Sequence, residues 1–162
     1  MAVTAATLAP PTSAPRWLDD DQQAQWRAYL FGTLALMARL DRDLKSHDLS
    51  LSEYEVLVRL SDNPDRRIRM AELAAETNQS RSRLTHTITR MEAAGLVRRR
   101  TCDADRRGVY AELTERGHDA LVDAAPTHVQ GVRDGLIDVV DPADMVAVGR
   151  AFTAVRERLE AS

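Results

Sequence analysis

The sequence is poor in the residues that form disulfides, metal sites and membrane spans. It has one cysteine, Cys102, among 162 residues, which excludes an intrachain disulfide and a cysteine-based zinc site. Its four histidines have no companion at metal-ligand spacing, so we expect no metal and no cofactor. No apolar stretch approaches the roughly 18 residues of a membrane span, and residues 1–15 lack the features of a secretory signal. We therefore expect a cytoplasmic protein without a membrane partner.

Motifs of common enzymes are also missing. The chain has no nucleophile elbow, no glycine-rich phosphate loop and no HExxH sequence. An acidic pair such as Asp41 and Asp43 is more simply explained as part of a solvated helix face. We expect no catalytic residues, and the length suits one domain rather than several.

Lysine is nearly absent, because 21 of the 22 basic residues are arginine. The net charge of -3 argues against a nucleic-acid-binding protein, whose binding domain is usually basic. The charge is uneven, however. Residues 66–107 hold 11 basic and 5 acidic residues, a net charge of +6, whereas residues 1–65 and 108–162 carry -4 and -5. A basic segment between acidic ones indicates an anionic partner for that segment.

Proline and apolar spacing define the first part of the chain. Three prolines among the first fifteen residues favour a disordered tail over residues 1–16. A helix is then expected from Asp19–Asp21 to about Ser46. The residues of its apolar face recur at spacings of three and four: Trp26, Leu30, Thr33, Met37, Leu40 and Leu44. This face is too long for one small domain to cover, so we expect part of it to contact a partner.

The basic segment and its approach predict helix, turn and helix. Ser52 and Glu55 form a candidate capping box for a second helix that ends at Asn63-Pro64. Residues 66–69 are expected to be extended, and residues 70–77 to form a short helix. Ser80 then caps a helix to about Ala94, which buries Leu84, Ile88 and Met91 and ends at Gly95.

The spacing of apolar residues changes from helical to strand-like after Gly95. Residues 96–101 and 109–113 are predicted to be two strands of a hairpin around a polar loop, and Thr114 to cap the next helix. Pro126 is expected to kink or break that helix, which then resumes through Val140. Asp141 caps the last helix, whose apolar residues step by three and four as a heptad-like seam of Met145, Val148, Phe152, Val155 and Leu159.

The helix after Ser80 has the chemistry of a recognition helix. Such a helix lies in the major groove with its early residues on base edges. No acidic residue occurs from Ser80 through Met91, whereas a solvated helix face usually mixes charge signs. The hairpin adds arginines, and an arginine at a wing tip can enter the minor groove. The hairpin's first strand and loop contain Arg98, Arg99, Arg100, Arg106 and Arg107, and Asp105 is placed to brace Arg107.

Residues of about 50–117 resemble the multiple antibiotic resistance regulator (MarR) family of bacterial winged helix-turn-helix transcription factors. The matching segments are LSLSEYEVLVRL, MAELAAET, SRSRLTHTITRMEAAGLVRRR and DADRRGVYAELTERG. The resemblance implies a mostly α (α+β) fold, a winged helix-turn-helix with a two-stranded β wing. Residues 48–117 would be the DNA-binding domain, and residues 17–47 and 118–160 a helical dimerisation region from both termini.

The resemblance implies a homodimer that binds pseudo-palindromic double-stranded DNA and represses neighbouring genes. It also implies roles for individual residues, which are assigned by their position in the matching segments. The implied dimer-interface residues are Leu18, Leu30, Met145, Val148, Phe152, Val155 and Leu159. The implied DNA-binding residues are Ser80, Arg81, Ser82, Arg83, Thr85, His86, Arg90, Arg106 and Arg107, with Asp105 as the brace.

Relatives often release DNA when a small aromatic or phenolic anion binds. The candidate effector-pocket residues here are Trp26, Tyr29, Tyr54 and His47; Phe31 is a further aromatic candidate. Aromatic side chains at helical spacing are more often packing residues. Three alternatives stay open: a constitutive DNA-binding protein, one that responds to oxidation of Cys102, and a winged helix used for protein–protein contact.

Overall fold

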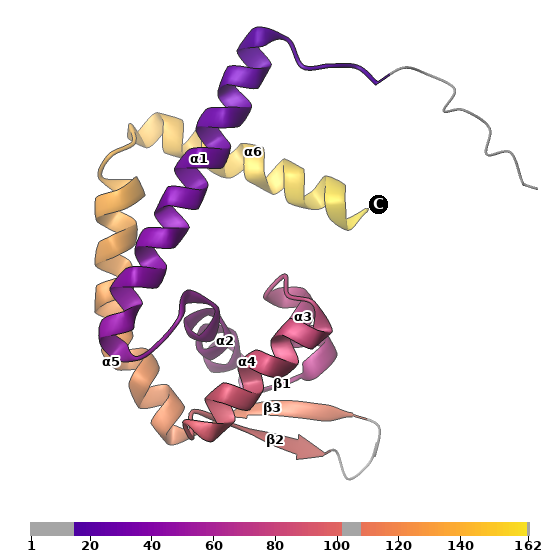
Figure 1. Ribbon diagram of the computed structural model, residues 1–162, viewed down its shortest axis with the longest axis vertical. Coiled ribbons are helices and arrows are strands. Elements are labelled where there is room, and N and C mark those ends of the chain that lie inside the picture. The colour runs from indigo at the N-terminus through magenta and orange to yellow at the C-terminus, as the bar shows by residue number, and fades with distance from the viewer. Residues whose placement is uncertain (1–14, 102–107, 162) are drawn as a thin grey trace, which may run out of the picture. The chain divides into compact units, whose positions relative to one another are not determined.

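The computed structural model describes residues 15–101 and 108–161 (Figure 1). All but the last two residues of the predicted tail, 1–16, lie outside these ranges. The elements, in chain order, are α1 (Asp20–Asp43), a 3₁₀ turn η1 (Leu44–His47), α2 (Leu51–Asp62), β1 (Arg67–Arg69), α3 (Met70–Glu76), α4 (Arg81–Ala93), β2 (Val97–Thr101), β3 (Val109–Leu113), α5 (Glu115–Val132), a π-helical turn η2 (Arg133–Ile137) and α6 (Pro142–Glu160).

The chain divides into two units at Thr33 and Leu34, within α1. In the first unit the rings of Trp26 and Tyr29 lie 5.8 Å apart on α1, and both side chains are substantially exposed. The second unit holds the remaining elements, including the helix-turn-helix and the sheet. The mostly helical winged fold expected from the sequence is confirmed.

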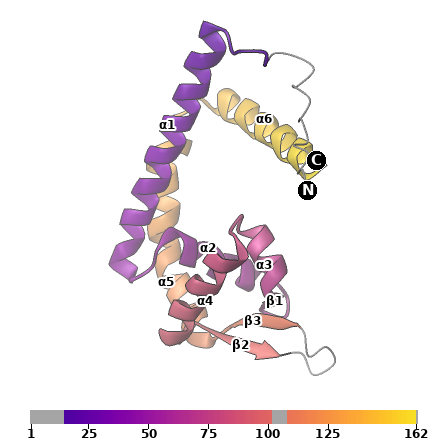
Figure 2. The same ribbon diagram turned by 45° about the vertical axis from the view of Figure 1, so that its right-hand side comes forward.

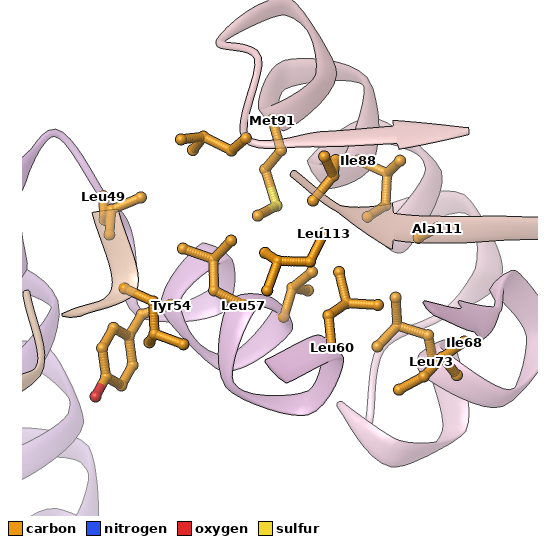
Figure 3. Packing of buried hydrophobic residues seen from close by; sticks show 14 of the residues in the cluster. Leu49, Tyr54, Leu57, Leu60, Ile68, Leu73, Ile88, Met91, Ala111 and Leu113 are labelled. Carbon is orange, nitrogen blue, oxygen red and sulfur yellow. The ribbon is translucent and has the colours of Figure 1, made fainter. Parts of the chain in front are cut away.

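One hydrophobic core joins helices α2, α3 and α4 to the sheet (Figure 3). Leu57, Leu60, Leu73 and Ile88 are fully buried and Leu113 nearly so. Each helix contributes residues three or four apart, and each strand contributes alternate residues, so every element buries one face only. The polar faces of α4 and of the sheet are thereby left in solvent.

The sheet has three antiparallel strands in the order β1-β3-β2. The predicted hairpin is present as β2 and β3, with Val97 opposite Leu113 and Thr101 opposite Val109. The extended stretch before α3 is also a strand, and β1 pairs with β3 through Ile68 and Ala111. The sequence predicted the extended conformation of this stretch but not its pairing. Both views show β2 and β3 running side by side (Figures 1 and 2).

Two of the predicted helix caps are confirmed, and a third is corrected. Ser80 and Thr114 cap α4 and α5 as predicted. The predicted Ser52–Glu55 box is wrong, because the box that caps α2 is formed by Ser50 and Glu53. Both pairs have the same spacing in the sequence. Ser50 is the residue in extended conformation, with φ -88° and ψ 159°, and only such a residue can direct its side chain to the first free amides of the helix.

Pro126 does not break α5, so the predicted break is wrong, while the alternative, a kink at Pro126, stays a prediction. The helix continues from Glu115 to Val132. Proline removes the hydrogen bond to the carbonyl four residues earlier, at Val122. Both Pro126 and Val122 lie on the exposed side of α5, where water can bond the freed carbonyl.

The last helix presents an apolar face to solvent. Asp141 caps α6 and Pro142 occupies its first turn, as predicted. The helix has no buried residue within the chain. Four of the five predicted seam residues are exposed apolar side chains, with Val148 39%, Phe152 40%, Val155 48% and Leu159 70% exposed. An apolar stripe of this kind is typical of a surface that meets another chain.

Gly117 marks the closest packing in the winged region. A Cβ atom at this position would lie 2.0 Å from the carbonyl oxygen of Leu96 and 2.9 Å from Cδ1 of Leu113. The same carbonyl accepts a 2.9 Å hydrogen bond from the Thr114 hydroxyl. That hydroxyl in turn accepts a 3.0 Å hydrogen bond from the Gly117 amide. The start of β2 and the start of α5 are therefore joined here, with no room for a side chain.

We predict that Gly117→Ala lowers the free energy of unfolding by about 3 kcal/mol, because backbone atoms must move to admit the methyl group. Urea denaturation followed by circular dichroism measures this. Gly149→Ala is the matched control, since nothing lies within 4 Å of its Cβ position and alanine favours a helix more than glycine does. Equal stability of the two variants would contradict the predicted clash.

Candidate nucleic-acid interface

The orientation of α4 is fixed by its cap and its buried side. The Ser80 hydroxyl accepts a 3.2 Å hydrogen bond from the Arg83 amide, which starts the helix. Leu84, Ile88 and Met91 then point into the core, with no more than 1% of each side chain exposed. Rotation of the helix about its axis would expose all three, so the opposite face must remain in solvent. Both predictions, the cap and the buried face, are confirmed.

The solvent face of α4 is rich in hydrogen-bond donors, and no acidic side chain occurs on it before Glu92 in the last turn. Guanidinium, imidazole and hydroxyl groups suit base edges and phosphates. The Thr85 hydroxyl donates to the Arg81 carbonyl at 2.8 Å, so its orientation is set within the helix. The predicted DNA-binding residues of this helix and its cap are all exposed: Ser80, Arg81, Ser82, Arg83, Thr85, His86 and Arg90.

Besides its predicted role in DNA binding, Arg90 forms an ion pair that the sequence did not predict. Its guanidinium lies 3.3 Å from Oε1 of Glu53, the residue of the capping box at the start of α2. The Glu53 side chain is 14% exposed and that of Arg90 is 65% exposed. Arg90 thus links α4 to α2 while much of its side chain stays in solvent.

Arg99 connects the wing to the recognition helix. One guanidinium nitrogen donates to Oε2 of Glu92 at 2.6 Å, and the other donates to Oγ1 of Thr89 at 2.8 Å and to the Thr85 carbonyl at 3.1 Å. The Arg99 amide also donates to Oε1 of Glu92 at 2.9 Å. These four bonds, which we call the Arg99 clamp, fix β2 against α4. Strand alternation gives a clue to this role, because Arg99 lies on the same face of β2 as buried Val97.

The neighbouring arginines point the other way. Arg98 and Arg100 face solvent from β2, and both donate to the carboxylate of Glu112 on β3. The hydrogen bond from Arg98 is the main reason that the pKa of the Glu112 carboxyl lies below its usual value. The sequence placed these arginines together as wing residues, whereas the sheet gives Arg99 a different role from Arg98 and Arg100.

The predicted wing-tip residues fall outside the described ranges. This applies to Arg106, Arg107, the brace Asp105 and Cys102. Their assigned roles remain predictions from the resemblance.

A cavity of about 380 Å³ lies between α2, α5 and the second half of α1. The rings of Tyr54 and His128 meet in its wall with centroids 4.4 Å apart. Burial lowers the pKa of His128 and raises the pKa of the Glu55 carboxyl. Within the described residues, Nδ1 of His128 is buried without a hydrogen-bond partner. The remaining lining residues are Leu36, Met37, Leu40, Leu51, Val58, Arg59, Val132 and Leu136.

Of the four predicted effector-pocket residues, Tyr54 lines this cavity. His47 does not. Its imidazole bridges Asp123 Oδ2 at 2.7 Å and Thr127 Oγ1 at 2.8 Å, which ties η1 to α5. Trp26 and Tyr29 belong to the first unit of the chain. His128 was not predicted, because only the fold brings α5 beside α2.

The part of the chain that the structure describes contains no cluster of three or more side chains suited to hold a metal ion. Within the same residues, no helix is both long and apolar enough to cross a membrane.

Comparison with known proteins gives consistent matches. Residues 47–108 match a family model described as MarR family. The structure superposes on AbsC of Streptomyces coelicolor with a TM-score of 0.86, at 43% identity, covering 91% of this chain and 100% of that one. Sco3205 of the same organism, solved in complex with DNA, gives a TM-score of 0.85 at 38% identity, covering 88% and 94%. Both solved structures are MarR family transcriptional regulators.

The transcriptional repressor MprA of Escherichia coli is 29% identical over 91 residues, which is 56% of this chain and 52% of MprA. The aligned part of the chain therefore spans about half the length of this curated relative.

We predict that Arg99→Ala lowers the free energy of unfolding by about 1–3 kcal/mol, because it leaves the Glu92 carboxylate without its charged partner. Thermal and urea denaturation of the purified variant measure the effect. Arg98→Ala is the control on the same strand, since its side chain is exposed and its acceptor Glu112 keeps Arg100. The clamp would be disproved by two variants of equal stability.

Proposed function

The chain belongs to the MarR family of transcriptional regulators, and we propose that it is a dimeric, sequence-specific DNA-binding regulator that represses genes near its own. The observation that carries the proposal is the solvent face of α4 and its cap, where seven donor-bearing residues between Ser80 and Arg90 are exposed and no acidic residue occurs before Glu92. The related Sco3205 has been solved with DNA. A regulator of this kind acts on the chromosome, so we propose a cytoplasmic location.

The exposed face of α6 supports a dimer. Within the part of the chain that the structure describes, no residue of its apolar seam, from Met145 to Leu159, is fully buried. We propose that residues 17–47 and 118–160 form the dimerisation region and that residues 48–117 bind DNA. A two-fold dimer then presents two copies of α4 to the half-sites of a pseudo-palindromic operator. Leu18 and Leu30 of α1 and its approach are the proposed contacts from the first unit.

The cavity beside Tyr54 supports regulation by a small molecule. Its wall is mostly apolar, and its polar groups are the Tyr54 hydroxyl, the His128 imidazole, the Arg59 cation and the Glu55 carboxyl, whose pKa is raised by burial. This combination suits a small aromatic or phenolic acid, whose ring would contact the apolar wall and whose carboxylate would pair with Arg59. We propose that such an effector, bound between α1, α2 and α5, releases the protein from DNA.

We predict that the protein binds a duplex selected from a random-sequence pool and that Arg83→Ala weakens binding by about 1–3 kcal/mol. Affinity should fall steeply with salt, because phosphate contacts release counterions. Fluorescence anisotropy at several salt concentrations measures both. Arg42→Ala is the charge-matched control, since Arg42 lies outside the helix-turn-helix. Salt-independent binding, or equal affinity of the two variants, would argue against this function.

We predict that hydroxybenzoates raise the melting temperature and weaken DNA binding, because a ligand that binds only the folded state stabilises it, by about 2.7 kcal/mol at a hundred times its Kd. Differential scanning fluorimetry measures the shift. Val58→Phe should abolish it by filling the cavity, whereas Val122→Phe, on the exposed side of α5, should not. A shift that survives Val58→Phe would place the ligand elsewhere.

A further inference from the structure

A polar hollow of about 440 Å³, which we call the α2–α4 hollow, lies between the recognition helix and the first turn of α2. One lining residue, Ser52, belongs to α2. The other lining residues belong to α4 and its cap: Ser80, Ser82, Arg83, His86, Thr87 and Arg90. No acidic residue occurs among the described residues that line it. All of the lining side chains can donate hydrogen bonds, which is the chemistry of a site for an anion.

Helical spacing gives the solvent side of α4 two edges. Arg83 and Arg90 are seven residues apart, so they lie on the same edge, and this edge borders the α2–α4 hollow. The other edge faces the wing, where Arg99 donates to the Thr85 carbonyl and to the Thr89 hydroxyl. A helix seated in the major groove has a DNA backbone on each side of it. The edge at the hollow is therefore suited to phosphates rather than to bases.

Arg90 is held at the hollow by the cap of α2. Its guanidinium lies 3.3 Å from Oε1 of Glu53, while Oε2 of Glu53 accepts hydrogen bonds from the Ser50 amide at 2.9 Å and from the Ser50 hydroxyl at 2.6 Å. An arginine has five N–H donors, and this ion pair uses only part of them. The Arg90 side chain is 65% exposed. Its restraint before binding reduces the entropy lost when an anion binds.

Two carboxylates of α2 lie near the arginines of the hollow. One is Glu53, the partner of Arg90. The other is Glu55: burial raises the pKa of its carboxyl, and the charges of Arg59 and Arg83 oppose part of that rise. Neither Glu53 nor Glu55 lines the hollow. Both carboxylates offset part of the positive charge, but the groups that an entering anion would contact are donors only.

Ser52 brings a hydroxyl from a second helix to the same space. The sequence predicted that Ser52 caps α2, whereas the structure gives that task to Ser50. The Ser52 hydroxyl is therefore not needed for the cap. Its side chain is partly exposed and borders the hollow opposite α4. A hydroxyl and a guanidinium that converge from two elements can hold one phosphate group between them.

We propose that the α2–α4 hollow binds one phosphate of the DNA backbone through the guanidinium groups of Arg83 and Arg90 and the hydroxyl of Ser52. The proposal rests on the DNA-binding function proposed above, and it adds a contact from α2 to those of α4. Contacts of this kind position a protein on the duplex without reading its sequence. In a two-fold dimer, each half-site has one such phosphate.

The test replaces single phosphates by neutral methylphosphonates along a duplex selected from a random-sequence pool, with fluorescence anisotropy as the readout. Wild-type affinity should decrease roughly tenfold at each phosphate that the protein contacts, since a charge-assisted bond is weakened there. Ser52→Ala and Arg90→Gln should each reduce that decrease at one and the same position of each half-site. At the other positions both variants should keep the wild-type pattern.

Ser46→Ala and Arg42→Gln are the matched controls, because η1 and the end of α1 contribute no residue to the hollow. Both should keep the wild-type pattern at every position. Ser52→Glu places a negative charge at the hollow and should weaken binding to the selected duplex and to an unrelated duplex by the same factor, roughly tenfold or more, since phosphates carry no sequence information. Ser46→Glu should weaken neither. Melting temperatures check that each variant is folded.

The phosphate site alone would be overturned if Ser52→Ala and Arg90→Gln acted at different positions, if only one of them acted, or if neither did. A loss in Ser52→Glu that is confined to the selected duplex would also overturn it and would indicate a base contact. If wild-type protein selected no duplex from the pool, the DNA-binding function itself would fail.

Discussion

The burial of α4 against one shared core is the constraint on which the rest of the structure depends. Leu84, Ile88 and Met91 are held by residues of α2 and of the sheet. Their burial fixes the rotation of the recognition helix, and the burial of Ile68 and Ala111 fixes which side of the sheet faces solvent. The basic surface of α4 is therefore positioned by apolar packing, which requires no specific interaction between the cations themselves.

Strand alternation divides the arginines of the wing between two tasks. Arg99 points inward and holds β2 to α4 through the Arg99 clamp. Its neighbours Arg98 and Arg100 point outward and donate to the Glu112 carboxylate. The inward arginine thus adds hydrogen bonds between β2 and α4 to the apolar packing that joins the sheet to the helices.

The sequence predicted most of the local structure, because caps and periodicity are local signals. Ser80, Thr114 and Asp141 were placed correctly, as was the buried face of α4. Predictions failed where two segments carry the same local signal, or where exposure to water determines whether a helix tolerates a proline. Ser50 and Ser52 both begin a serine–glutamate pair of capping-box spacing, and Pro126 is tolerated because its side of α5 faces water.

Contacts between segments that are distant in the chain could not be predicted from the sequence. The pairing of β1 with β3, the partnership of His128 with Tyr54 and the link from Arg90 to Glu53 each join residues more than thirty-five positions apart. For the candidate site, the residues of α4 were predicted individually, whereas the different roles of Arg98, Arg99 and Arg100 required the strand pairing.

The most direct measurement of the central claim is a crystal structure of the protein bound to a selected operator duplex. We expect a two-fold dimer with α4 of each protomer in the major groove and Arg81 to His86 against base edges. A complex in which the duplex contacts another surface, with α4 left in solvent, would contradict it.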